Sequence, residues 1–139
     1  MALPPAVGNL YTATIDGTAV TSDWVALMTR TDLPGGDFEP LAFDAEVRRL
    51  GMDYAGLPPA MLGRMTRLYG TKARVLLGAA KTTADLGLHF GADLHAQEVD
   101  YLVANEWART AQDVLWRRTK LGLRFNGDEV AALEAYLAR

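Results

Sequence analysis

The sequence predicts an all-α protein: a compact bundle of about five to six short helices preceded by an irregular N-terminal arm. After Phe43, apolar residues recur about every three to four positions, which is the spacing of one helix face. Glycines separate the segments that show this spacing, and glycine commonly ends a helix. The first 40 residues are instead rich in Pro, Gly, Thr and Asp, a composition typical of turns and loops.

The N-terminal arm and linker are expected to cover residues 1–32, and the helical domain residues 33–139. Within the arm, residues 10–20 alternate apolar and polar side chains around Asp16-Gly17, a pair that favours a hairpin turn. A hairpin of two lone strands is only marginally stable. An irregular arm is therefore the main expectation, and a hairpin is the alternative.

Six segments carry helix signals after a turn at residues 33–37. The expected helices are residues 44–50, 58–69, 71–80, 94–107, 110–121 and 126–137. Asp44 is placed to cap the first helix, and Gly51 to end it. The last two helices begin with pairs of residues three positions apart that suit a capping box: Thr110 with Asp113, and Asn126 with Glu129.

The spacing of apolar residues also predicts which side chains are buried. The expected buried residues are Leu57, Met61, Met65, Leu68, Val75, Leu76, Ala79, Leu94, Val99, Leu102, Val103, Trp107, Val130, Leu133, Tyr136 and Leu137.

The composition excludes several function classes. The chain has no cysteine, so disulfides, thiolate metal sites, iron–sulfur clusters and cysteine nucleophiles are ruled out. No apolar run approaches the roughly 18 residues of a membrane span. No glycine motif for a dinucleotide or a P-loop is present. The net charge of −3 argues against non-specific binding of nucleic acid.

The few residues with catalytic or metal-binding chemistry do not form a recognisable site. His89 and His95 are six residues apart, which would place them on nearly opposite sides of a helix. A metal site with Asp93 and Glu98 is an alternative, but two ordinary polar contacts are the favoured interpretation. Ser22 is the only serine, and no histidine accompanies it in a nucleophilic pattern.

Two basic clusters and one aromatic pair remain. The basic residues are Arg64, Arg67, Lys72 and Arg74 in the first cluster, and Arg117, Arg118, Lys120 and Arg124 in the second. We interpret both mainly as helix-terminal charges paired with neighbouring carboxylates, with an anionic partner (lipid headgroup, nucleic acid or acidic domain) as the alternative. Trp107 and Trp116, with arginines beside them, suit either an interface or the edge of a core.

Residues 106–110 (Glu-Trp-Ala-Arg-Thr) and 113–122 (Asp-Val-Leu-Trp-Arg-Arg-Thr-Lys-Leu-Gly) closely resemble the C-terminal helical domain of the bacterial aerobic, FAD-dependent glycerol-3-phosphate dehydrogenases. Further similar segments follow in the family's order: residues 33–36, 68–70, 76–78, 84–87, 90–91 and 98–103. The resemblance covers roughly residues 28–137, whereas the residues before it depart from the family pattern.

The resemblance implies a parent enzyme that oxidises sn-glycerol 3-phosphate to dihydroxyacetone phosphate and passes electrons through FAD to a quinone. The flavin and the catalytic groups would lie in an N-terminal flavin domain and a substrate domain. We therefore expect this chain to be a separated C-terminal domain that is inactive alone, with no catalytic, FAD-contacting or metal-binding residue of its own. The residues expected to form an inter-helix and inter-domain lock are Glu106, Trp107, Arg109, Trp116, Arg117 and Arg118.

The expected partners are the flavin and substrate domains of the parent chain, and no nucleic acid. The resemblance implies a cytoplasmic location, with the parent bound peripherally to the cytoplasmic face of the inner membrane; homodimer formation stays open. The alternatives are a free-standing all-α interaction or nucleic-acid-binding module, with helices flanking Gly122, and a small independent enzyme.

Overall fold

The computed structural model describes residues 10–15, 18–23 and 35–139. The chain divides into two compact units, residues 1–37 and 38–139.

The first unit contains a β-hairpin of two strands, β1 (Leu10–Ile15) and β2 (Thr18–Asp23). The strands are antiparallel, and Ile15 lies opposite Thr18. This register leaves a two-residue loop, which is the hairpin that Asp16-Gly17 indicates as the alternative to an irregular arm. The loop itself and the rest of the arm and linker, residues 1–9 and 24–34, lie outside the described residues.

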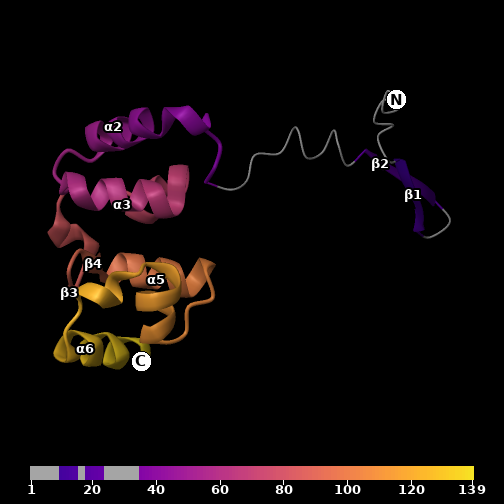
Figure 1. Cartoon of the computed structure of the whole chain (residues 1–139). Helices are drawn as coiled ribbons and strands as arrows, with labels where there is room; N and C mark the ends of the chain where they lie inside the picture. Colours follow the sequence, from indigo (N-terminus) through magenta and orange to yellow (C-terminus); the bar gives the residue numbers. More distant parts are fainter. Residues whose placement is uncertain (1–9, 16–17, 24–34) are drawn as a thin grey trace, which may run out of the picture. The chain divides into compact units, whose positions relative to one another are not determined.

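The second unit is helical, which confirms the all-α fold class. Its elements are η1 (Pro40–Ala42), α2 (Phe43–Asp53), α3 (Pro59–Tyr69), η2 (Gly70–Lys72), α4 (Ala73–Leu77), η3 (Thr83–Leu86), β3 (His89–Gly91), β4 (Leu94–His95), α5 (Ala96–Asn105), η4 (Asp113–Arg118), η5 (Leu121–Arg124) and α6 (Gly127–Leu137). In Figure 1, α2 lies beside α3, and α6 lies at the other end of the unit, next to β3. None of the described helices is long and apolar enough to cross a membrane.

One apolar core joins the helices of this unit. Its largest fully buried side chains are Leu50, Met61, Leu62, Met65, Leu77, Leu86, Leu94, Leu102, Leu115 and Leu133. The expected burial of Leu57 just before α3, of Met61 and Met65 on α3 and of Leu133 on α6 is confirmed. Tyr136 packs against the core from α6, with its ring edge on Phe90.

Two of the three predicted helix caps form. Asn126 accepts a hydrogen bond from the backbone N–H of Glu129, and Glu129 accepts one in return. Thr110 and Asp113 form the same reciprocal pair. The prediction for α2 is wrong at both ends, because the helix begins at Phe43 without a side-chain cap and runs through Gly51 to Asp53.

The expected burial of Leu68, Val75 and Ala79 is wrong. The third helical segment begins with the 3-10 turn η2, and α4 ends early, since Gly78 adopts a left-handed backbone with φ of +54°. A turn that is not α-helical changes the angle between successive side chains, so the predicted stripe does not continue through it to Val75 and Ala79. Leu68 lies before this turn, near the end of α3, and is 38% exposed. Leu76 remains buried, whereas Val75 points to solvent.

The predicted helix of residues 94–107 is also wrong at both ends. Leu94 belongs to β4, which pairs antiparallel with β3, and α5 begins only at Ala96. The helix ends at Asn105, and Trp107 beyond it adopts a left-handed backbone with φ of +55°. Val103 and Trp107 are exposed, contrary to expectation.

Candidate docking surface

A buried network of charges holds α3 to the start of α5. Arg64 donates two hydrogen bonds to the carboxylate of Glu98, each 2.7 Å long, and one of 2.8 Å to Asp93 Oδ2. The Tyr69 hydroxyl donates a further hydrogen bond of 2.7 Å to Glu98. Since the Glu98 side chain is only 1% exposed and that of Arg64 13%, these partners satisfy a charge pair that has lost most of its water.

The network shifts the pKa values of its members in directions that fit this burial. Burial would lower the pKa of Arg64, but its hydrogen bonds and charge interactions with Glu98 and Asp93 raise the pKa on balance. Burial raises the pKa of Tyr69, and the Glu98 carboxylate raises it further. Arg64 therefore keeps its charge, and Tyr69 its hydroxyl proton, near neutral pH.

Most of the first basic cluster is occupied inside the domain. Besides Arg64, Arg74 pairs with Glu46 and with Asp53 of α2. The guanidinium of Arg67 lies 5.8 Å from the ring centre of Phe43. These contacts agree with the interpretation that the cluster pairs helices with one another.

The second basic cluster lies on η4 and η5 and is more open to solvent. Arg117 forms an ion pair of 2.6 Å with Asp113, but its side chain is 73% exposed. Arg118 lies 3.6 Å from Glu106, with both side chains about one-third exposed. Exposed pairs of this kind contribute little to stability, so these arginines remain accessible to a partner.

Asp113 organises the start of this basic segment. Its carboxylate accepts hydrogen bonds of 3.0 Å from the backbone N–H groups of Arg109 and Thr110. These bonds, together with the Thr110 hydroxyl and the Arg117 charge, lower the pKa of Asp113 to about 2. The segment that follows is a π-helical turn, in which the backbone N–H and the hydroxyl of Thr119 both donate to the Val114 carbonyl.

Trp116 is 41% exposed, and its indole lies against the backbone of Gly122. A Cβ atom at Gly122 would lie 2.4 Å from the indole Cε2, closer than atoms approach in proteins. Glycine at this position therefore allows η5 to fold back onto the indole.

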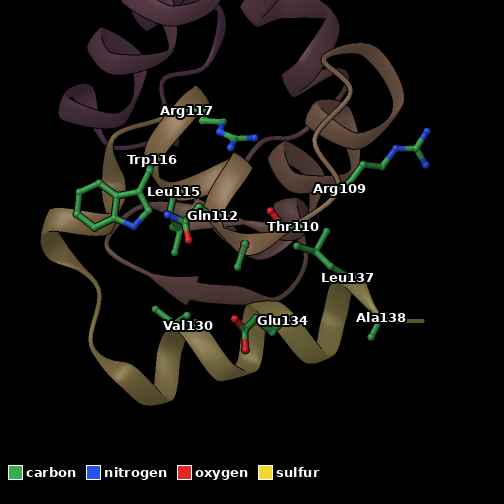
Figure 2. A pocket seen from close by; sticks show the side chains of 11 residues that line it. Arg109, Thr110, Gln112, Leu115, Trp116, Arg117, Val130, Glu134, Leu137 and Ala138 are labelled. Carbon is green, nitrogen blue, oxygen red and sulfur yellow. The ribbon is translucent and has the colours of Figure 1, made fainter.

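Two hollows border the predicted lock residues. The larger, of about 610 Å³, lies between η4 and α6. In Figure 2, Leu115 faces Val130 and Glu134 across it, and the Arg109 side chain extends outward. The smaller hollow, of about 160 Å³, lies near the end of α5 and is lined by Leu68, Tyr69, Leu102, Glu106, Arg117 and Arg118.

Five of the six predicted lock residues line one or both of these hollows. Glu106, Arg117 and Arg118 meet around the smaller hollow. Trp116 and Arg109 line the larger one together with Arg117. Trp107 lines neither and is 79% exposed. The role of this set as a lock stays a prediction.

Sequence reasoning assigned no role to the buried network, although its central residue was visible in the pattern. Glu98 precedes the apolar Leu102 by four positions and so shares the buried face of α5. A carboxylate on an apolar helix face requires a buried partner. Nothing in the sequence identified Arg64 as that partner, because it lies 34 residues away.

The two histidines lie together, contrary to the prediction from helical spacing, because they occupy opposite positions of the β3–β4 pair. Their ring centres are 4.8 Å apart. His89 Nε2 lies 2.9 Å from the Ala92 carbonyl, and His95 Nδ1 lies 3.3 Å from that of Asp93. Within the part of the chain that the structure describes, no group of three or more potential metal ligands occurs.

Comparisons with known proteins identify the helical unit. Residues 28–138 match the family model described as the C-terminal domain of alpha-glycerophosphate oxidase. The chain is 41% identical over 114 residues to a glycerol-3-phosphate dehydrogenase of Pseudomonas aeruginosa, covering 82% of this chain and 22% of that protein. It is 40% identical over 100 residues to the D-erythritol 1-phosphate dehydrogenase of Brucella abortus, covering 72% of this chain and 20% of the relative.

The aerobic glycerol-3-phosphate dehydrogenase of Escherichia coli is 40% identical over 105 residues, covering 76% of this chain and 21% of that enzyme. The chain thus spans about a fifth of the length of the curated relatives it matches. The matched range confirms the resemblance carried by residues 106–110 and 113–122. The chain belongs to the family of the C-terminal domain of alpha-glycerophosphate oxidase.

Proposed function

We propose that this chain is the C-terminal structural domain of an FAD-dependent glycerol-3-phosphate dehydrogenase. The whole enzyme would oxidise sn-glycerol 3-phosphate to dihydroxyacetone phosphate and pass the electrons through FAD to a quinone. The match of residues 28–138 to the family model carries this proposal. Two relatives with about 40% identity are glycerol-3-phosphate dehydrogenases, which supports the substrate.

We infer that the flavin and the catalytic base for this oxidation lie outside the helical unit. Hydride transfer from a secondary alcohol requires the flavin, a base for the hydroxyl proton and cations for the phosphate. Beside the larger hollow, the N-terminus of α6 is capped by Asn126, and Asp113 occupies the N–H groups of Arg109 and Thr110. These donors are not free to bind a flavin pyrophosphate, so we assign FAD to the remainder of the parent enzyme.

The domain would then have a structural role, in which it packs against the flavin and substrate domains of the parent. The relatives support a structural role, because one of them, at 40% identity, is named for D-erythritol 1-phosphate. Similar identity across relatives with different substrates suggests that this domain does not select the polyol phosphate. We further propose that the parent associates peripherally with the cytoplasmic face of the inner membrane.

A segment exchange tests this function. In the Pseudomonas aeruginosa relative, the matched segment is replaced by residues 28–138 of this chain. Oxidation of glycerol 3-phosphate is then measured with an artificial electron acceptor, for the chimera and for the 139-residue chain alone. We expect activity and flavin absorbance in the chimera and neither in the chain alone. Turnover by the chain alone would contradict the proposal.

A further inference from the structure

Trp107 combines an exposed side chain with a backbone conformation that is unfavourable for tryptophan. Its φ is +55°, in the left-handed region that favours glycine, and its side chain is 79% exposed. Non-glycine residues in this region carry a conformational cost, which persists where the surrounding structure or a function requires it. A large apolar side chain in such a position has little to gain from its own domain, because most of its surface stays in water.

The backbone around Trp107 fixes this conformation. The N–H groups of Glu106 and Ala108 both donate to the Leu102 carbonyl, with lengths of 3.0 and 3.2 Å. Ala108 is fully buried. The chain therefore reverses at the end of α5 through residue 107, the position at which helices commonly use glycine. The turn holds the indole outward whether or not the indole makes a contact within the domain.

The surroundings of Trp107 are those of a contact site. The side chain of Arg109 has no hydrogen bond or ion pair with the described residues, so its charge is uncompensated. Just before Trp107, Glu106 lines the smaller hollow with Arg117 and Arg118. An exposed tryptophan beside accessible arginines has the composition that dominates binding energy in protein interfaces.

We propose that Trp107 is the anchor by which this domain docks onto the catalytic part of the parent enzyme, inserting its indole into an apolar pocket bordered by carboxylates. This inference rests on the proposed function and names the contact through which the domain acts. The length of the relatives supports the catalytic part as the docking partner, since about four-fifths of each relative lies outside the matched segment.

The charge of the segment around Trp107 indicates that the partner surface is acidic. Five basic residues lie between positions 106 and 124, whereas only two acidic residues do: Arg109, Arg117, Arg118, Lys120 and Arg124, against Glu106 and Asp113. The whole chain has a net charge of −3, so this segment is positive within an acidic chain. A carboxylate on the partner can pair bidentately with Arg109, while the indole supplies the apolar contact.

Two substitutions separate docking from folding. Trp107→Gly and Trp107→Ala both remove the indole, but only glycine suits a positive φ. In the 139-residue chain, we expect Trp107→Gly to melt close to the unchanged chain and about 4 °C above Trp107→Ala. In the chimera described above, we expect both variants to lose docking to the same extent.

Docking in the chimera is measured by the rate of limited proteolysis at the domain junction and by oxidation of glycerol 3-phosphate. Removal of a central interface tryptophan should raise the cleavage rate about tenfold or more. Met52→Ala is the matched control, because Met52 on α2 is 73% exposed and lies outside residues 106–124 and outside both hollows. We expect this control to leave both measurements unchanged.

The outcomes distinguish this inference from the proposed function. A chimera with unchanged Trp107 that is inactive and rapidly cleaved would overturn the proposed function and the inference with it. An active, resistant chimera in which Trp107→Gly behaves like the unchanged protein would overturn the inference alone. So would a 139-residue Trp107→Gly chain that melts far below the unchanged one, since the indole would then hold the domain itself together.

Discussion

Replacing Arg64 by alanine tests whether burial, rather than distance, determines the strength of the ion pairs in this domain. The substitution leaves Glu98 as a buried carboxylate with only the Tyr69 hydroxyl as a side-chain partner. Removing one member of a buried ion pair typically costs about 3–5 kcal/mol, because the other charge stays desolvated. We expect a loss of that size, which is about a fifth or more of the stability of a typical domain.

The pair of Arg117 with Asp113 is the control for this prediction. Its N–O distance of 2.6 Å is as short as the 2.7 Å between Arg64 and Glu98. Arg117 is, however, 73% exposed, and Asp113, whose side chain is 13% exposed, keeps its hydrogen bonds from the backbone N–H groups of Arg109 and Thr110 when the pair is broken. We expect Arg117→Ala to leave the free energy of unfolding unchanged within experimental error.

The free energy of unfolding is measured by urea denaturation at pH 7, followed by far-ultraviolet circular dichroism. Two further variants keep the result interpretable if Arg64→Ala does not fold. Arg64→Lys should lose less, since it keeps the charge but not the bidentate geometry. The double change of Arg64 and Glu98 to Met should recover more than half of the loss, because the carboxylate of Glu98, which is 1% exposed, is removed together with its partner. A cost of less than about 1 kcal/mol for Arg64→Ala would refute the reasoning.

Three other predictions concern the helix starts and turns. Because Asp113 has a pKa of about 2, below its value of about 3.9 in an unfolded chain, its contribution to stability is complete above pH 4 and falls as the pH drops toward 2; Asp113→Asn should flatten this part of a melting curve against pH. Thr119→Val should cost about 1–3 kcal/mol in urea denaturation and Thr119→Ser less, because the hydroxyl bonds both the Val114 carbonyl and the N–H of Leu121. Burial lowers the pKa of His95, so its contribution to stability is complete above about pH 6.5 and falls as the pH decreases below that value; His95→Gln should reduce the fall in melting temperature between pH 7.5 and pH 5.5.

Local features of the fold could be predicted from the sequence because their physical causes are local. The Asn126–Glu129 pair lies within one helical turn, and its reciprocal hydrogen bonds form where the pattern places them. The same holds for the end of α3, where Gly70 supplies the positive φ that ends the helix. Such signals need only the residues within a few positions of each other.

Features that depend on distant residues or on a change of helix geometry could not be predicted. Arg64 and Glu98 lie on different helices, and only the packing of α3 against α5 brings them together. Trp107 fits the apolar spacing of α5, but the left-handed turn after Asn105 directs its side chain into solvent. The spacing rule assumes a continuous helix, so it fails at the position where the helix stops.

The positions of Arg64 and Trp107 explain why stability and docking can be separated in this domain. Arg64 pairs with Glu98 in the core, as the main interpretation of its basic cluster expects, so its loss should destabilise the domain. Trp107 seemed suited to the core, but a turn bonded to the Leu102 carbonyl holds it in solvent. Since that turn depends on backbone groups and not on the indole, the side chain can change without loss of the fold. Because the turn fixes the backbone of Trp107 during folding, docking does not have to lose that conformational entropy again. The effect of the domain on a parent enzyme should therefore depend on Trp107 far more than on the basic clusters.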